Sequence, residues 1–210
     1  MKMNGIKNII FDLGGVIIPI DIQRTYQAFM KIAERNLFSL PDFKQIDIFH
    51  DLEIGNINEV QFRDKLRLLI GDVSDEEIDT AWLDLLLHLP EERLRLIKEL
   101  KNDYRIILLS NTNDIHLRAI RLQNTFMVPE LHFKNLFEQE YYSHEINLRK
   151  PSKEIYQYVL DKSGLKASET IFIDDIYENA MAAELVGIRG MHLDLTKQDL
   201  TAFFESMKVD

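Results

Sequence analysis

Short runs of apolar residues alternate with amphipathic stretches along much of the chain. The first run, Asn8–Phe11, is β-branched and aromatic, and Asp12 and two glycines follow it directly. This pattern is typical of a buried strand that ends in a tight turn. Similar apolar runs predict three more strands, at Arg105–Leu109, Thr170–Ile173 and Ile188–Leu193.

Amphipathic stretches separate these strands and predict helices. They cover Glu91–Lys101, a segment from the capping residue Ser152 to about Lys162, and Glu178–Val186. Gly164 and Gly187 follow the last two, as glycine commonly does where a helix ends. Strands that alternate with helices form parallel α/β sheets, and wholly apolar strands fit burial on both faces. The sequence therefore predicts a Rossmann-like parallel sheet with helices on both faces.

The segment between the first strand and Leu89 has helical patterns only. Apolar residues at helical spacing predict an amphipathic helix from Asp21 to about Arg35. Two capping boxes predict further helix starts near Glu59 and Asp75. The capping pairs are Asn58 with Gln61 and Ser74 with Glu77. We therefore expect an α/β core made of residues 1–17 and 90–210, with residues 18–89 inserted as an all-helical cap.

Composition and charge narrow the class of protein. The chain has 210 residues, of which 46% are hydrophobic and 29% charged, as in ordinary globular proteins. Its 35 acidic and 25 basic residues give a formal charge of −10, which disfavours nucleic acid and anionic membranes as partners. The absence of cysteine excludes disulfides, thiolate zinc sites and a cysteine nucleophile.

Hydropathy gives no sign of a membrane span or a signal peptide. The N-terminal apolar run is short, Asp12 interrupts it, and no small-residue cleavage site follows. No other stretch approaches the ~18 uninterrupted apolar residues that a span requires. We therefore expect a cytoplasmic protein. No pattern sets the oligomeric state, and a monomer is compatible with the sequence.

Polar side chains follow three of the predicted strands. They are Asp12 after the first strand, Ser110 and Asn111 after the second, and Asp174 and Asp175 after the third. Ligands of open α/β sheets bind beyond the carboxyl ends of the strands, so these residues are expected to converge there. Lys150, just before a predicted helix, is a fourth element that could join them.

The residue types at this edge suit a phosphate group and a magnesium ion. Asp12 with Asp174 or Asp175 provides the hard oxygen ligands that Mg²⁺ prefers. The metal would neutralise the attacking carboxylate and one phosphoryl oxygen, while Lys150 and Ser110 hold the others. Asp12 could then act as a nucleophile and form an aspartyl-phosphate.

Four segments resemble the motifs of the haloacid dehalogenase superfamily of hydrolases. In chain order they are Asp12-Leu13-Gly14-Gly15-Val16, Ser110-Asn111, Lys150-Pro151 and Asp174-Asp175. A helical cap inserted after the first motif marks one subgroup. Within it, FDLGGVI, LLSNTN, LRKP, FIDD and the cap segment Glu53–Ile57 are similar to the α-D-glucose-1-phosphate phosphatase branch.

The resemblance implies a Mg²⁺-dependent phosphatase that hydrolyses a small phosphorylated metabolite, such as a sugar phosphate. Asp12 and Lys150 would be the catalytic residues, with Asp12 as nucleophile. Ser110, the Asn111 amide and Lys150 would hold the phosphate. The metal would be bound by Asp12, by the Gly14 carbonyl and by Asp174, with Asp175 a ligand through water or a supporting group.

One departure from the family leaves the proton donor open. Most phosphatases of the family carry a second aspartate at the position of Gly14, where it serves as general acid and base, and the glucose-1-phosphatase-like branch shares this gap. The proton could come from water, from the substrate or from a cap residue, for which His50 and Glu53 are candidates by position. Asn179 stands where many relatives have an acid, and its amide could orient the site by hydrogen bonds.

Other interpretations stay open at this stage. A metal-independent 2-haloacid hydrolase is one, because the family's dehalogenases also lack the second aspartate; a catalytically weak phosphometabolite-binding protein is another. Each residue also has a structural interpretation: Asp12 as a turn former, Ser110, Asn111 and Asp175 as helix caps, and Lys150 as a surface lysine.

Overall fold

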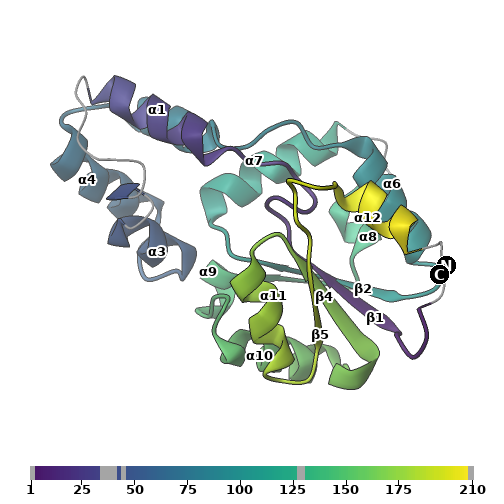
Figure 1. Ribbon diagram of the computed structural model, residues 1–210. Coiled ribbons are helices and arrows are strands. Elements are labelled where there is room, and N and C mark those ends of the chain that lie inside the picture. The colour runs from purple at the N-terminus through teal and green to yellow at the C-terminus, as the bar shows by residue number, and fades with distance from the viewer. Residues whose placement is uncertain (1–2, 34–41, 44–45, 127–130, 208–210) are drawn as a thin grey trace.

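The computed structural model describes residues 3–33, 42–43, 46–126 and 131–207. A parallel sheet of five strands forms the centre of the fold, in the order β3-β2-β1-β4-β5. Figure 1 shows β1, β2, β4 and β5 at the centre of the core, with helices around them. The strands are β1 (Asn8–Phe11), β2 (Arg105–Ser110), β3 (Gln139–Tyr142), β4 (Thr170–Asp174) and β5 (Arg189–His192). The strand β1, which carries the first motif, therefore lies in the middle of the sheet.

Alternate residues of the central strands face two separate hydrophobic cores. Ile9 and Phe11 of β1 belong to one core, and Ile10 between them belongs to the other. The first core is covered by α6 (Glu91–Leu100), α7 (Asp114–Thr125), α8 (Phe133–Leu136) and α12 (Leu200–Ser206), and the second by α10 (Lys153–Ser163) and α11 (Tyr177–Glu184). The predicted parallel sheet with helices on both faces is confirmed.

Four described helices lie between β1 and α6 and form what we call the cap. They are α1 (Ile22–Ile32), α3 (Asp47–Glu53), α4 (Glu59–Ile70) and α5 (Asp75–Leu83). The cap has its own aromatic core, in which the rings of Phe49 and Trp82 stack with centroids 4.7 Å apart. The predicted limits of the cap, residue 18 at its start and residue 89 at its end, stay a prediction.

The helix starts predicted in the cap are confirmed. Capping boxes form at Asn58 with Gln61 and at Ser74 with Glu77, where each side chain satisfies a backbone N–H that the helix leaves unpaired. Asp21 caps α1 through the N–H of Gln23. The predicted end of this helix near Arg35 lies outside the described residues.

The two linkers that join cap and core hydrogen-bond to each other. The N–H of Asp21 donates to the carbonyl of Leu85 at 2.9 Å, and the N–H of Leu87 donates to the carbonyl of Pro19 at 3.1 Å. An isolated antiparallel bridge pairs Ile20 with Leu86 between them. The chain therefore enters and leaves the cap side by side.

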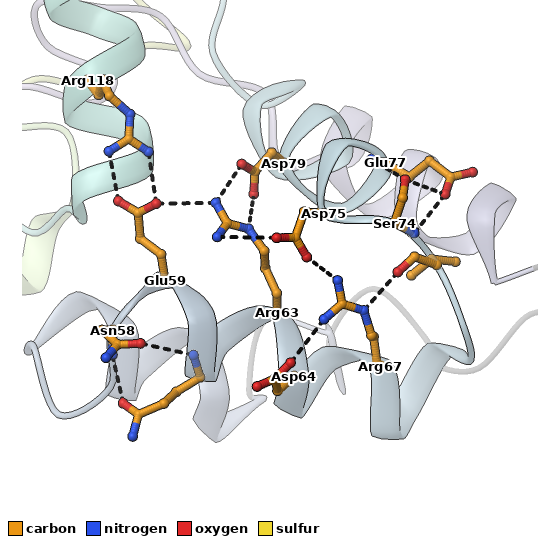
Figure 2. Close-up of polar contacts among 12 residues, drawn as sticks. Asn58, Glu59, Arg63, Asp64, Arg67, Ser74, Asp75, Glu77, Asp79 and Arg118 are labelled. Atoms are coloured by element: carbon orange, nitrogen blue, oxygen red, sulfur yellow. Dashed lines mark hydrogen bonds and ion pairs between the residues drawn. The ribbon is translucent and has the colours of Figure 1, made fainter.

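Ion pairs and a ring stack seat the cap on the core helix α7. Arg63 of α4 donates to Asp79 at 2.7 Å and to Glu59 at 3.2 Å, and Glu59 in turn accepts two bonds from Arg118 of α7 (Figure 2). Trp82 stacks on His116 of α7 with ring centroids 4.6 Å apart. Because α7 follows β2, these contacts hold the cap over the carboxyl ends of the strands.

The sequence pattern gives no sign of the edge strand β3. Its residues, Gln139 to Tyr142, are half polar and become buried only toward the carboxyl end. Among the described strands, β3 pairs only with β2. Such an edge strand lacks the continuous apolar run that marks a buried parallel strand. Among the described helices, none has the length and apolar character needed to cross a membrane.

Two predicted helix caps differ in detail. The N-cap of α7 is Asn113, whose side chain accepts from the N–H of His116, so the capping interpretation of Ser110 and Asn111 is wrong. Ser152 occupies the N-cap position of α10, but its hydroxyl donates to Glu154 and makes no capping hydrogen bond.

Candidate active site

The order of the strands brings the motif residues together. Phe11 pairs in register with Ile173 of β4 and with Leu108 of β2. Asp12, just past the end of β1, therefore lies beside Asp174, the last residue of β4. The structure thus places the polar ends of β1, β2 and β4 at one edge of the sheet, as parallel strands require.

Lys150 lies between the two carboxylates. Its Nζ donates to Oδ1 of Asp12 at 2.6 Å, to Oδ2 of Asp174 at 2.7 Å and to the carbonyl of Leu109 at 3.2 Å. The residue is only 1% exposed, so the surface-lysine interpretation is wrong. Burial alone would lower the pKa of Lys150, but the charges of Asp12 and Asp174 raise it above its ordinary value. Lys150 is therefore a buried cation.

The side chain of Asn111 fixes the backbone of Lys150. Its Oδ1 accepts from the N–H of Lys150 at 2.9 Å, and its Nδ2 donates to the carbonyl of the same residue at 3.0 Å. This pair joins the end of β2 to the loop that carries the lysine. The side-chain amide of Asn111 is therefore engaged with the Lys150 backbone, and a phosphate contact by Asn111 stays a prediction. Ser110 is buried at the same end of β2 and lines the cavity described below.

Asn179 orients Asp174 by hydrogen bonds. Its Nδ2 lies 3.1 and 3.2 Å from the two carboxylate oxygens of Asp174, and Oδ1 of Asp174 also accepts from the N–H of Ile176 at 2.8 Å. Together with the bond from Lys150, these contacts fix the Asp174 side chain, which is fully buried. The Asn179 amide thus orients the Asp174 carboxylate, a role that the sequence offered as one possibility.

A cluster of three carboxylates marks a candidate metal site. One oxygen each from Asp12, Asp174 and Asp175 lies within 4.8 Å of the others. Burial, together with the charge of Asp174, raises the pKa of Asp12 to about 8, and Lys150 offsets only part of this rise. Burial and the charge of Asp174 also raise the pKa of Asp175 to about 6. A divalent cation would relieve this crowding of negative charge, and the all-oxygen donor set fits Mg²⁺.

The close approach of Gly15 to Asp175 gives a testable prediction. Gly15 has φ +81°, and a Cβ built there would lie 2.3 Å from Oδ2 of Asp175. We expect Gly15→Ala to displace Asp175 and to weaken Mg²⁺ affinity by roughly 10–100-fold, measured by titrating activity against Mg²⁺.

Gly164→Ala is the matched control. Gly164 also has a positive φ, of +61°, but a Cβ there meets nothing within 4 Å. The Gly164→Ala variant should have the same kind of backbone strain, from a positive φ, but an unchanged affinity for Mg²⁺. Equal Mg²⁺ affinity in both variants would show that Asp175 does not contribute to the site.

A cavity of about 400 Å³ lies between these residues and the cap. Its floor includes Asp12, Gly14, Ser110, Lys150 and Asp175. Its walls are largely apolar and come from the cap and the linkers, including Ile20, Ile22, Phe43, Phe49, Trp82 and Leu86. The cap therefore forms part of the cavity wall above the carboxylates. The implied role of the Gly14 carbonyl stays a prediction.

Two polar groups of the cavity wall come from opposite sides of the cap–core boundary. Glu53, at the end of α3, accepts from Arg149 of the core at 2.9 Å, and both residues line the cavity. His50, the other cap candidate, is exposed and is not among the residues of the cavity wall. The sequence did not single out Arg149, whose position beside Lys150 is its only local signal.

Arg93 is a second residue that sequence reasoning missed. It lies in α6, is 7% exposed, and donates to the carbonyls of Gly15 at 3.1 Å and Val16 at 2.9 Å. It thereby fixes the backbone of the first motif. In the sequence it is one of several charged residues on an amphipathic helix, so no local pattern distinguishes it.

A family model for haloacid dehalogenase-like hydrolases matches residues 6–187. The chain belongs to this family. The match includes all four motifs and the inserted cap, so the resemblance found in the sequence is confirmed at the level of the family. The geometry above is thus that of a haloacid dehalogenase-like hydrolase with the second aspartate of the first motif replaced by Gly14.

Relatives with assigned activities cover almost the whole chain. A D-ribitol-5-phosphate phosphatase of Bacteroides thetaiotaomicron is 32% identical over 184 residues, which is 87% of this chain and 89% of that protein. A sesquiterpene phosphatase of Aspergillus oryzae is 28% identical and covers 89% of each chain. A family enzyme of B. thetaiotaomicron, solved with magnesium and inorganic phosphate, has a TM-score of 0.82 at 35% identity, over 95% of this chain and 99% of that one.

Proposed function

We propose that this protein is a Mg²⁺-dependent phosphatase that hydrolyses a small phosphorylated metabolite through an aspartyl-phosphate on Asp12. The observation that carries the proposal is the placement of Lys150 between Asp12 and Asp174 on the floor of a cavity that the cap helps to line. A buried cation beside an attacking carboxylate provides charge complementary to a phosphoryl dianion. The phosphatase relatives and the relative solved with magnesium and phosphate support the same activity.

In this mechanism each residue has a distinct task. Asp12 attacks the phosphorus atom, and Lys150 and Ser110 hold phosphoryl oxygens while Asn111 fixes the lysine loop. Asp12, Asp174 and Asp175 would hold the Mg²⁺, and the bound ion supplies positive charge that neutralises the attacking carboxylate and a phosphoryl oxygen. Water then hydrolyses the aspartyl-phosphate, and the cap limits the access of bulk water to the site.

The alternative hydrolase is less well supported. A 2-haloacid dehalogenase that attacks carbon needs no metal and has little use for Asp174 and Asp175 as ligands. Here burial and the nearby charge of Asp174 raise the pKa values of Asp12 and Asp175. A bound metal ion would stabilise the charged form of both carboxylates. A weak phosphometabolite-binding protein would share this geometry and is distinguished from an enzyme by turnover alone.

Hydrolysis of p-nitrophenyl phosphate tests the proposal. Its leaving group needs no protonation, so formation of the aspartyl-phosphate in this assay depends on the nucleophile, the phosphate contacts and the metal, and not on a proton donor. We expect turnover with Mg²⁺, a loss of at least about 100-fold on chelation, and recovery when Mg²⁺ is restored. Turnover that ignores the chelator, or release of halide from a 2-haloacid, would favour the dehalogenase; binding of phosphate with no turnover would favour the binding protein.

For the substrate we propose first the phosphate of a sugar or sugar alcohol, on the likeness to the D-ribitol-5-phosphate phosphatase. A second candidate is the phosphate of an apolar alcohol. It is favoured by the apolar walls of the cavity, such as Phe49 and Trp82, and by the sesquiterpene phosphatase relative.

Comparing kcat/KM for D-ribitol 5-phosphate and for n-pentyl phosphate separates the two candidates, because the chains have equal length. For an apolar site, kcat/KM should rise roughly fourfold with each methylene of the alkyl series until the cavity is filled. A site for hydroxylated substrates should instead have the higher kcat/KM for ribitol phosphate. The alkyl chain would leave the polar groups of such a site without hydrogen-bond partners.

A further inference from the structure

A phosphatase with glycine at position 14 needs another source of protons. The oxygen that leaves from an alkyl or sugar phosphate must be protonated, and a positioned general acid contributes roughly 10²–10⁴-fold to the rate. Among the described residues, the titratable side chains that line the cavity are Asp12, Glu53, His116, Arg149, Lys150 and Asp175.

Most of these groups are unsuited to the task. Asp12 is the nucleophile, Asp175 belongs to the carboxylate cluster, and Lys150 already donates to both Asp12 and Asp174. Arg149 does not release a proton at any working pH. This leaves two candidates, His116 and Glu53.

His116 is excluded by its surroundings. Its Nε2 lies 2.9 Å from the carbonyl of Trp82 and so donates to it, and its Nδ1 lies 3.1 Å from Nδ2 of Asn113. Burial lowers its pKa to about 4, so the ring is neutral and both nitrogens are engaged. Glu53 is therefore the remaining acid.

Glu53 reaches the cavity because the cap is seated on the core beside it. Asn147 of the core donates to the carbonyl of Ile54 at 2.8 Å. Gly55, with φ +73°, lies so close that a Cβ would come within 2.3 Å of the carbonyl of His144. These contacts flank the Glu53–Arg149 pair, so the seating of the cap and the position of the carboxyl group depend on each other.

We propose that Glu53 is the general acid and base of the reaction, supplied by the cap in place of the missing aspartate; this rests on the proposed phosphatase function. As an Asp12 oxygen bonds to phosphorus, the bond from phosphorus to the leaving oxygen breaks, and that oxygen keeps the electron pair and takes the Glu53 proton. The Glu53 carboxylate then removes a proton from the water whose oxygen bonds to phosphorus. The aspartyl bond breaks, which releases phosphate and restores Asp12 and protonated Glu53.

The charges around Glu53 fit both halves of this cycle. Burial raises the pKa of Glu53 above its ordinary value, while the neighbouring Arg149, His50 and Lys150 offset part of this rise. The protonated form is thus more populated than in an exposed glutamate, and Arg149 stabilises the carboxylate that remains after transfer. Because the acid is the protonated form, turnover of substrates with poor leaving groups should fall as pH rises through this pKa.

The experiment compares Glu53→Gln with the wild type on phenyl phosphate and p-nitrophenyl phosphate. The first has the poorer leaving group, and the second needs no proton. In single turnovers, which report formation of the aspartyl-phosphate and not its hydrolysis, we expect the rate of phenol release to fall by about 100-fold or more. The rate of p-nitrophenol release should change by less than about fivefold. The decline of the phenol-release rate at high pH should disappear in the variant.

Glu59→Gln is the control for cap seating. It removes the same charge from the cap and the ion pair with Arg118, but Glu59 does not line the cavity. The ratio of the two rates should be unchanged in this variant. An equal loss on both substrates in Glu53→Gln, no loss on either, or the same change of ratio in Glu59→Gln would overturn the proposal. If the wild type fails to hydrolyse p-nitrophenyl phosphate, the proposed function itself fails, whatever the role of Glu53.

Discussion

Asp12→Asn is expected to lower kcat for p-nitrophenyl phosphate by on the order of 10⁵-fold, since loss of a covalent nucleophile removes the reaction path itself. Asparagine has the shape of aspartate but no charged oxygen with which to attack phosphorus. It can still accept the hydrogen bond from Nζ of Lys150, which lies 2.6 Å from Oδ1 in the wild type. The variant should therefore fold while losing its activity.

The matched control is Asp161→Asn. Asp161 is an exposed aspartate on α10 that does not line the cavity, so this variant should keep the wild-type rate. Circular dichroism and thermal unfolding of both variants establish that the fold is intact. Activity of Asp12→Asn within tenfold of the wild type would exclude Asp12 as the nucleophile.

Lys150→Met is expected to remove activity and to lower the stability of the metal-free protein. Methionine fills much of the same volume but leaves the buried carboxylates of Asp12 and Asp174 without their cation. Breaking a buried ion pair by removing one partner typically costs about 3–5 kcal/mol. For a chain of this size that corresponds to a fall in Tm of roughly 6–20 °C.

Magnesium should reverse part of this loss. An ion that binds only the folded state stabilises it by mass action, and in Lys150→Met it also replaces the missing positive charge. We therefore expect a larger Mg²⁺-induced rise in Tm for this variant than for the wild type, measured by calorimetry. Lys153→Met, which changes an exposed lysine on α10, controls for the loss of charge; an equal Tm in the two variants would contradict the role given to the buried cation.

Local patterns were sufficient where local interactions decide the structure. The strands β1, β2 and β4 are buried on both faces, so each contains an unbroken run of three or four apolar residues. The capping boxes at Asn58 and Ser74 involve residues three apart and are satisfied within one turn of helix. Neither feature requires knowledge of distant parts of the chain.

Features that depend on distant segments were not predictable in the same way. The sequence offered Lys150 as a site residue, but its contacts with two carboxylates arise only when β1 and β4 pair. The edge strand β3 is set by its pairing with β2 rather than by its own composition. The meeting of Glu53 with Arg149 needs both a folded cap and its seat on the core, so the sequence could only offer Glu53 as a candidate by position.

The paired linkers make the cap a separable module. Because Ile20 and Leu86 form an antiparallel bridge, the chain leaves and re-enters the core at points only about 5 Å apart. Any helical insert whose ends lie that close could replace this cap without moving the sheet. Residues that choose the substrate could thus be exchanged while those that attack phosphorus stay in place. In this chain the exchange has a condition, since an incoming cap must also bring its own acid.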